Sequence, residues 1–362
     1  MMTSDFDYNL PKEFIAQSPM EPRDCSRLMV VDKDIKKIEH RNFYDIADYL
    51  QLGDLLVWNN SKVFKARLTG KIALDKNSSG LKENIRTTGK ILNVSAPVEI
   101  FLLRPAENFG VWRVLAKPAK KLRLGMKVKF ADDFEAEVIF KNEDGTVLMQ
   151  FNEDDLSVRA KANKYGEVPL PPYIKNKVES DLKYQTVYAK QEGSVAAPTA
   201  GFHFTSELIE KIKNKGVEFA EVTLHVGLGT FQPVKTEKLE EHKMHSEWVE
   251  IAAKNADLIN QAKADGRRVI AVGTTTVRVL EGMSQKFPIL QPFSGDINIF
   301  IVPGFKFKII DALITNFHLP KSTLLMLVCA FAGDREFILK CYEEAKIEKY
   351  RFYSFGDAMM VK

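Results

Sequence analysis

The sequence predicts a layered α/β sandwich with a small all-β barrel domain inserted into it. Three observations predict this fold class. The chain has 362 residues, which exceeds one ordinary domain and favours two. From residue 203 onward, segments with helical periodicity alternate with segments that have strand periodicity, as in α/β proteins. Between about 55 and 155, short apolar runs are separated by Gly, Pro, Asn and Asp, a pattern typical of a small barrel.

The elements of the alternating part follow in order from residue 205. Thr205 can cap a first helix, which stops at Gly216. The strand 217–226 comes next, and its alternation places His225 on the polar face, near the carboxyl end. The later expected elements are a helix near 253–265, a strand over 269–272, a helix opened by the turn 273–276, a strand over 297–302, and two closing helices capped by Ser322 and Asp334.

The inserted barrel domain is expected over 55–155, which leaves 1–54 and 156–362 for the α/β domain. Within it, the polar stretch 75–97 is rich in Gly, Ser and Asn and indicates a long surface loop without a catalytic role. The strands expected in this domain are Leu55–Val57, Val98–Leu103, Val111–Leu115, Lys127–Phe130, Glu135–Phe140 and Thr146–Phe151.

Composition narrows the setting in which the protein works. Hydrophobic residues make up 45% of the chain, enough for well-packed cores. The three cysteines show no paired spacing, so we expect neither a disulfide framework nor a cysteine-based zinc site, and we predict a cytoplasmic protein. The N-terminus lacks the apolar run of a signal peptide, and no apolar stretch reaches membrane-spanning length. The net charge of +4 permits an anionic partner without requiring one.

Histidines are concentrated in one part of the chain. Of six histidines, five lie between residues 203 and 318. Histidine is the side chain that most easily gains or loses a proton near neutral pH, so this concentration favours chemistry over packing. Each of the five lies in or just before one of the polar motifs Ser194–Thr205, Thr223–Val234, Lys243–Trp248 and Thr315–Thr323, and Val272–Arg278 is a fifth motif of this kind.

These motifs, with segments elsewhere in the chain, match a known family in order from end to end. The further segments are Phe6–Pro11, Gln17–Asp24, Gly53–Val57, Pro169–Ile174, Tyr184–Tyr188, Pro303–Gly304 and Tyr350–Ala358. On these residues the chain resembles the S-adenosylmethionine:tRNA ribosyltransferase-isomerase family of the queuosine pathway. Each motif alone is a weak signal, but their order makes the match specific, and it covers the whole chain except the loop 75–97.

The resemblance implies an unusual transferase reaction. The family moves the ribosyl carbons of S-adenosylmethionine onto 7-aminomethyl-7-deazaguanine at the wobble position of certain tRNAs, which gives epoxyqueuosine and releases adenine and methionine. The resemblance thus implies S-adenosylmethionine as co-substrate, such a tRNA as partner, no metal, and an α/β domain with an inserted barrel. We expect a monomer that does not bind membranes. The positions that depart from the family's usual residues, and so receive no essential role, are Asn60, Lys65, Gln232 and Asn298.

The implied reaction needs a base, because a proton must leave the carbon next to the sulfonium. Neutral histidine with a pKa near the operating pH suits this role. His225 is the leading candidate, because it lies at the end of a strand, where α/β folds bind ligands. The other candidate catalytic residues are His203, His245 and His318, and roughly half of the four are expected to be structural.

The loops that follow two strands are the expected binding sites for the co-substrate. Free backbone N–H groups at the helix start 273–276 attract anions, so this turn, helped by Arg278, could hold the methionine carboxylate. Simple N-capping explains such a turn equally well. Glycines at 227 and 229 would permit close backbone approach to a ligand, or form a plain tight turn. The residues predicted to bind the co-substrate are Gly227, Gly229, Thr230, Thr274, Thr275 and Arg278.

Basic side chains gather between 104 and 129, where eight basic residues accompany a single acid, Glu107. Such segregated charge, with Trp112 in its midst, fits contact with an RNA backbone, and an ordinary solvated face is the alternative. The helix start 320–323 offers a further phosphate site. The residues predicted to contact nucleic acid are Arg104, Lys117, Lys120, Lys121, Arg123, Lys321 and Arg351.

Two other functions fit parts of the pattern. A non-catalytic RNA-binding protein would show basic patches without a clustered polar pocket, so the gathered histidines disfavour it. A metal-dependent hydrolase could use His225, His242 and His245, since the last two have metal-like spacing, but no acidic or cysteine ligand completes that pattern. The transferase is therefore the leading hypothesis.

Overall fold

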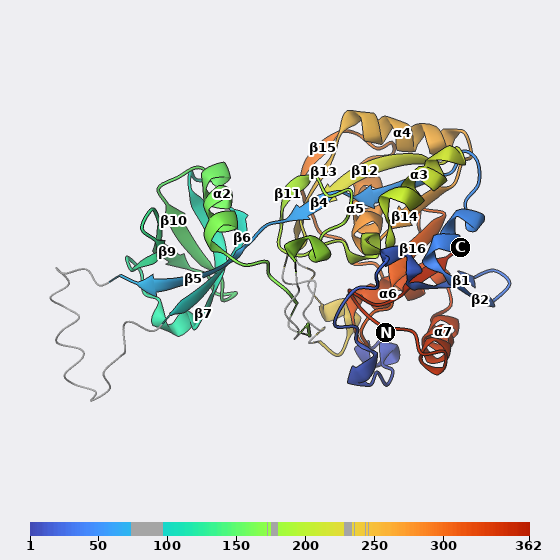
Figure 1. The fold of residues 1–362 in the computed structure, drawn as a ribbon, viewed down its shortest axis with the longest axis horizontal. Coiled ribbons are helices and arrows are strands. Elements are labelled where there is room, and N and C mark those ends of the chain that lie inside the picture. Colours follow the sequence, from blue (N-terminus) through green and yellow to red (C-terminus); the bar gives the residue numbers. More distant parts are fainter. Residues whose placement is uncertain are drawn as a thin grey trace. The chain divides into compact units, whose positions relative to one another are not determined.

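The computed structural model describes residues 1–73, 97–171, 173–174, 180–227, 234, 236–242, 244 and 246–362. The chain separates into two units, one built from Met1–Lys62 with Leu170–Lys362 and the other from Val63–Pro169. The second unit is thus an insertion, and Figure 1 shows it in light blue to green. The predicted surface loop lies outside the described residues over 75–96.

Two elements belong to a different unit from the one we expected. Leu55–Asn59 forms β3, a central strand of the larger unit, whereas Leu55–Val57 was expected in the barrel. Asp155–Tyr165 forms the helix α2, which belongs to the inserted unit rather than to the α/β domain. The first error has a physical reason, because a short apolar run suits a barrel strand and a fully buried strand of a parallel sheet equally well.

The larger unit is organised around one mixed sheet. Its strands are Arg27–Asp32 (β1), Lys37–Asn42 (β2), β3, Glu218–Leu224 (β12), Glu247–Ile251 (β13), Val269–Val272 (β14), Phe293–Ile297 (β15), Ala312–Asn316 (β16) and Ala358–Val361 (β17). The order is β15-β13-β12-β3-β14-β16-β17-β1-β2. The central strands β12, β3, β14 and β16 are parallel, so their carboxyl ends meet at one edge of the sheet.

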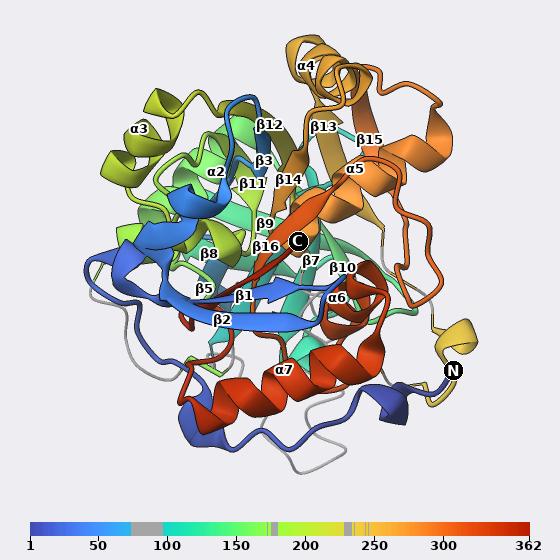
Figure 2. The same cartoon turned by 90° about the vertical axis from the view of Figure 1, so that its right-hand side faces the viewer.

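Helices cover both faces of this sheet, which confirms the predicted α/β sandwich. They are Ser206–Asn214 (α3), Ala253–Ala264 (α4), Thr274–Lys286 (α5), Thr323–Ala332 (α6) and Arg335–Ile347 (α7). Leu55 and Val57 of β3 pack into a core shared with α4 to α7, whereas Leu56 and Trp58 pack into a core shared with α3. Figure 2 accordingly shows α3 on one side of β14 and β16 and α5 on the other.

The predicted helix caps are confirmed. Thr205, Ser322 and Asp334 each accept a hydrogen bond from the backbone N–H three residues on, which satisfies a donor that the helix itself leaves free. The short 3-10 helices of this unit are Thr3–Phe6, Lys12–Phe14, Arg23–Cys25, Phe43–Tyr49, Asp181–Tyr184, Thr199–His203 and Leu239–Glu241.

The strand expected over 297–302 is wrong. The structure has β15 at Phe293–Ile297, and the described residues 298–302 form no strand. Ile299 and Ile301 are nevertheless buried. Alternating apolar side chains can therefore enter the core here without the pairing of a β-ladder, which the sequence pattern alone does not distinguish.

The inserted unit is a small barrel, as predicted; it is closed by six strands, of which Arg67–Ile72 was not predicted. Its strands are Arg67–Ile72 (β5), Val98–Pro105 (β6), Val111–Lys117 (β7), Lys127–Ala131 (β8), Phe134–Lys141 (β9) and Val147–Phe151 (β10), in the order β10-β7-β6-β5-β8-β9. A short 3-10 helix, Ala119–Lys121, follows β7. Trp112 is only 1% exposed, so it fills the barrel and does not serve as an RNA-stacking side chain.

Two features complete the described architecture. Ser61–Val63 (β4) and Gln191–Ser194 (β11) form a separate two-stranded sheet. None of the helices in the described ranges combines the length and the apolar character needed to cross a bilayer.

Candidate functional site

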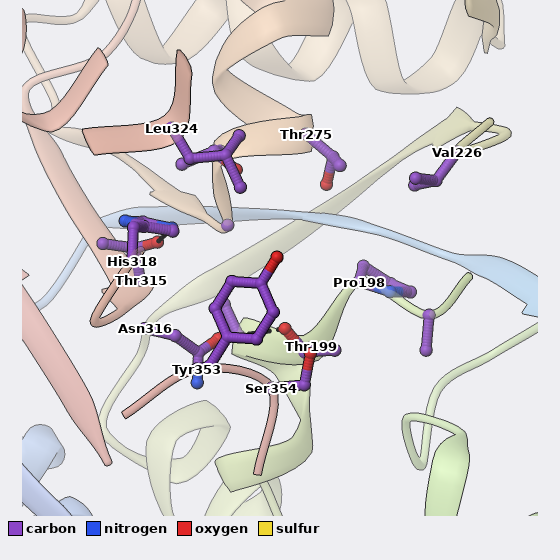
Figure 3. Close-up of a pocket in the computed structure, with 14 residues that line it drawn as sticks. Pro198, Thr199, Val226, Thr275, Thr315, Asn316, His318, Leu324, Tyr353 and Ser354 are labelled. Carbon is purple, nitrogen blue, oxygen red and sulfur yellow. Dashed lines mark hydrogen bonds between the residues drawn. The ribbon is translucent and has the colours of Figure 1, made fainter. Parts of the chain in front are cut away.

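A pocket opens at the carboxyl ends of β14 and β16, beside the start of α5. Ligands of α/β sheets bind outside the carboxyl ends of parallel strands, so the position is typical of a binding site. The pocket has an empty volume of about 510 Å³, part of which is open to solvent. Figure 3 shows Tyr353 at its centre, His318 and Leu324 at one end, and Val226 at the other. Its residues come from Ala197–Ala200, Val226, Gly273–Thr275, Thr315, Asn316, His318, Leu324, Tyr353 and Ser354.

The start of α5 presents backbone donors to this pocket. Gly273 has a φ of 88°, a conformation that a side chain disfavours, and it turns the chain from β14 directly into the helix. No side chain caps the helix start. The N–H groups of Thr274 and Thr275 therefore have no intrahelical acceptor, and the Thr275 hydroxyl has no partner among the described residues. Such a helix start favours an anion.

Thr199, Asn316 and Tyr353 are among the pocket residues that the sequence analysis missed, although each lies inside a quoted motif. The Thr199 hydroxyl donates to Asn316 Oδ1 at 3.2 Å, and Asn316 is 4% exposed. Tyr353, at φ 73°, packs edge-on against Tyr173 with its ring centroid 4.1 Å away. Each of their motifs also contains a histidine or a basic residue. The sequence analysis chose that residue as the candidate and passed over the neutral polar side chains that line the cavity.

His318 lines the pocket but is enclosed by the protein on its other sides. Its Nε2 lies 3.3 Å from the Thr315 hydroxyl and its Nδ1 lies 3.4 Å from the Tyr342 hydroxyl. Burial lowers the pKa of His318 to about 3. Burial therefore favours the neutral form of His318, and its predicted role in proton transfer stays a prediction.

His203 is also buried and neutral. Burial, followed by the charges of Arg351 and Arg23, lowers the pKa of its ring to about 3. Nδ1 lies 2.7 Å from the Ser26 hydroxyl and Nε2 lies 3.0 Å from the Asn316 amide nitrogen. Both ring nitrogens are thus occupied by protein partners, and the ring does not line the main pocket. The catalytic role of His203 likewise stays a prediction.

His225 occupies a different setting. It follows β12 directly and is half-buried, with its ring stacked on Trp248 at a centroid distance of 4.8 Å. A Cβ atom at Gly193 would lie 2.5 Å from His225 Nε2, so the glycine makes room for the imidazole. His225 does not line the pocket, but the next residue, Val226, does. His245 lies outside the described residues.

Arg278 is held inside the protein. It is 5% exposed, and its Nη1 donates to the buried Glu247 carboxylate. Arg278 Nε and Nη2 have no hydrogen-bond partner among the described residues, yet the side chain does not line the pocket. The predicted role of Arg278 in binding the carboxylate stays a prediction. Thr274 and Thr275 do line the pocket.

The other predicted ligand residues are only partly described. Gly227 is half-buried, and open space lies where its Cβ would be. Gly229 and Thr230 lie outside the described residues. Of the predicted metal-like group, His242 packs edge-on against Phe300 at 5.2 Å. Within the described ranges, no three His, Cys, Asp or Glu side chains are grouped to hold a metal ion.

Comparison with known proteins identifies the family. The model of a family described as "Queuosine biosynthesis protein" matches residues 3–361. This chain belongs to that family. The resemblance inferred from the motifs is thereby confirmed, and the chain is an enzyme of the queuosine biosynthesis family.

Curated members of the family match over their full length. The S-adenosylmethionine:tRNA ribosyltransferase-isomerase of Thermotoga maritima is 49% identical over 362 residues, and that of Sulfurihydrogenibium sp. is 50% identical over 363 residues, with 100% of both chains covered in each case. A crystal structure of S-adenosylmethionine tRNA ribosyltransferase from Thermotoga maritima matches 99% of this chain and 100% of its own, with a TM-score of 0.55 and 38% identity in the structural comparison.

The predicted nucleic-acid residues of this family member fall into two groups. Lys117, Lys120, Lys121 and Arg123 are exposed on the barrel unit and form no ion pair within the described residues, and Arg104 is exposed on β6. Lys321 instead pairs with Asp7 at 2.8 Å, and Arg351 lies 3.4 Å from Asp357. The barrel group is therefore the more available to phosphate.

The neutral His203 makes stability depend on pH in a defined direction. In the folded protein its pKa is about 3, whereas an unfolded histidine has a pKa of about 6.5. As pH falls from 6.5 to 3, the unfolded state gains a proton that the folded state does not. The ring thus lowers the free energy of unfolding by up to about 1.4 kcal/mol per pH unit in this window, and has no effect above it.

We expect His203→Gln to remove this dependence, because glutamine does not titrate. The measurement is the free energy of unfolding in urea at several values between pH 4 and 7. The variant should show a shallower decline than the parent below pH 6.5. Parallel pH profiles would mean that His203 accepts a proton in the folded state.

Proposed function

We propose that this chain moves and isomerises the ribosyl moiety of S-adenosylmethionine onto 7-aminomethyl-7-deazaguanine at the wobble position of tRNA. The product would be epoxyqueuosine in tRNA, with adenine and methionine released. The observation that carries the proposal is the pocket beside α5, because residues from several family motifs converge there although they lie far apart in the sequence. Membership of the family supports the reaction type.

The pocket suggests how the co-substrate is held. The methionine carboxylate is assigned to the free N–H groups of Thr274 and Thr275, since a helix start stabilises negative charge. The neutral part of the ligand is assigned to Asn316, Thr199 and Tyr353, whose side chains can donate and accept hydrogen bonds. No lining side chain carries a formal charge, because burial keeps His318 neutral by lowering its pKa.

The proton transfer is assigned to His225. The sulfonium acidifies the neighbouring carbon, and a base must remove that proton while adenine leaves with another. His203 and His318 are fully buried and neutral, whereas His225 is only half-buried and directly precedes the pocket residue Val226. His245 remains a second candidate. The protein is taken to be a cytoplasmic monomer that requires no metal.

The experiment that tests this function is incubation of the purified protein with adenine-labelled S-adenosylmethionine and tRNA. We expect free adenine to appear when the tRNA carries 7-aminomethyl-7-deazaguanine, and not when the tRNA carries guanine there. Equal adenine release with both tRNAs, or no release with either, would contradict the proposal. Stoichiometric zinc in purified protein that releases no adenine would instead favour the metal-dependent hydrolase.

We assign tRNA binding to the basic segment of the barrel, Lys117–Arg123. Replacing Lys117, Lys120 and Lys121 together by alanine should weaken tRNA binding and flatten its salt dependence. Each lost phosphate contact removes roughly 0.7–0.9 from the slope of log affinity against log salt concentration. Affinity for S-adenosylmethionine should not change.

The barrel offers a matched control for this experiment. Lys127 and Lys129 are also exposed, but they pair with Glu135 and Asp132. Their replacement by alanine should alter the salt slope much less. If the triple variant and this control both keep the parent slope, the lysines form only a solvated face, and the RNA contact must lie in the larger unit.

A further inference from the structure

A chain of hydrogen bonds leads from the interior of the larger unit to the pocket. The Ser26 hydroxyl lies 2.7 Å from His203 Nδ1, and His203 Nε2 lies 3.0 Å from Asn316 Nδ2. Asn316 Oδ1 then accepts a hydrogen bond from Thr199 at 3.2 Å. Figure 3 shows the pocket end of this chain, with Asn316 and Thr199 beside Tyr353.

The inner part of the chain is almost fully buried. Ser26, His203 and Asn316 are each at most 4% exposed. The ring of Phe43 packs against the imidazole with a centroid distance of 5.0 Å. A neutral imidazole has one donor and one acceptor nitrogen, so one partner must accept a hydrogen bond and the other must donate one. As Asn316 is oriented, its Nδ2 donates to Nε2, and Nδ1–H donates to Ser26.

We propose that His203 is a positioning residue, which fixes the carboxamide of Asn316 in the pocket and takes no part in proton transfer. The inference rests on the proposed function and deepens it. With Nδ2 engaged by His203 and Oδ1 by Thr199, the amide is held in one plane. Its second N–H and the second lone pair of Oδ1 remain for a ligand.

The chemistry of this end of the pocket indicates which part of the substrate it meets. The polar side chains here, those of Asn316, Thr199 and Tyr353, are uncharged. An amide or a hydroxyl group can both donate and accept a hydrogen bond. A sugar hydroxyl likewise donates and accepts. The fixed amide of Asn316 therefore orients the ribosyl hydroxyls of S-adenosylmethionine, and its misplacement would act on the reacting geometry rather than on the anionic end of the ligand.

The test is a set of variants assayed by tRNA-dependent adenine release, with kcat and KM measured separately. His203→Ala frees the Asn316 amide, and we expect kcat/KM to fall by about 10²-fold, the scale of a misplaced substrate contact. His203→Gln can place an amide oxygen or nitrogen near the position of Nε2, so it should recover most of that loss. A general base would not be replaced by glutamine, and equal loss in both folded variants would overturn the proposal.

A double-mutant cycle with Asn316 tests whether the two residues act together. Asn316→Ala removes the group that His203 positions, so adding His203→Ala should cause little further loss. Effects that multiply would show that His203 acts independently of Asn316 and would contradict the proposal. Ser26→Ala removes the hydrogen bond to His203 Nδ1 with a smaller change in side-chain volume. This variant replaces His203→Ala in the test if His203→Ala fails to fold. It should lower kcat/KM in the parent and not in the Asn316→Ala background.

Measuring both adenine release and affinity for S-adenosylmethionine separates the positioning role of His203 from the proposed function. If the parent protein releases no adenine, the proposed function fails, and the affinity for S-adenosylmethionine then reports on the pocket. In that case His203→Gln should bind the ligand more nearly like the parent than His203→Ala does. Unchanged affinity in both variants would overturn the positioning role.

Discussion

Replacing His225 by alanine is expected to lower turnover by ~10²–10⁴-fold while the fold stays intact, since this is what a lost general base typically costs. The residue follows β12, is half-buried, and directly precedes the pocket residue Val226. Single-turnover adenine release with modified tRNA measures the chemical step. Calorimetric affinity for S-adenosylmethionine should change far less than the rate.

Two further variants separate proton transfer from packing. His225→Phe keeps an aromatic ring to stack on Trp248, as the imidazole does at 4.8 Å, but has no nitrogen. His225→Gln keeps a hydrogen-bonding group without a basic nitrogen. Both should be as impaired as His225→Ala. Near-normal turnover of any of the three would remove His225 from the catalytic residues and direct attention to His245.

The second large effect concerns stability. Arg278→Ala should lower the free energy of unfolding by about 3–5 kcal/mol, because it removes the cation of a buried ion pair. Arg278 and Glu247 are each 5% exposed, so the carboxylate loses its charged partner in a region with little water. Urea denaturation at neutral pH measures the change.

The matched control replaces both partners. Arg278→Met combined with Glu247→Leu should recover much of the lost stability, since apolar side chains of similar volume often replace a buried ion pair without cost. The affinity of the folded double variant for S-adenosylmethionine then tests a direct role in binding. Parent-like stability of Arg278→Ala, together with lost affinity, would restore Arg278 as the carboxylate ligand.

Local sequence patterns predicted the features of this fold that depend on local interactions. The caps at Thr205, Ser322 and Asp334 formed as predicted, because a capping side chain and its N–H partner lie three residues apart. The turn at Gly273 opens α5 for the same kind of reason, since backbone conformation there depends on one residue.

Features that depend on distant partners could not be predicted in this way. Assigning Leu55–Asn59 requires knowing that β12 and β14 flank it, since an apolar run by itself suits both units. Trp112 lies in a basic segment, yet strand alternation turns it into the barrel core.

The same limit applies to the site. The motifs located the pocket segments, but the role of His203 depends on partners 177 and 113 residues away, Ser26 and Asn316. A histidine in a motif does not reveal whether its nitrogens face a ligand or the protein. Burial, which lowers the pKa of His203 and His318 to about 3, likewise depends on the surrounding fold and not on the motif.

The most direct test of the central claim is a crystal structure of this protein with S-adenosylmethionine bound in the absence of tRNA. We predict that the ligand occupies the pocket beside α5. Its carboxylate should lie within hydrogen-bond distance of the N–H groups of Thr274 and Thr275, and its ribosyl hydroxyls should lie beside Asn316. A ligand bound outside this pocket, or one whose carboxylate makes no contact with the start of α5, would contradict the account.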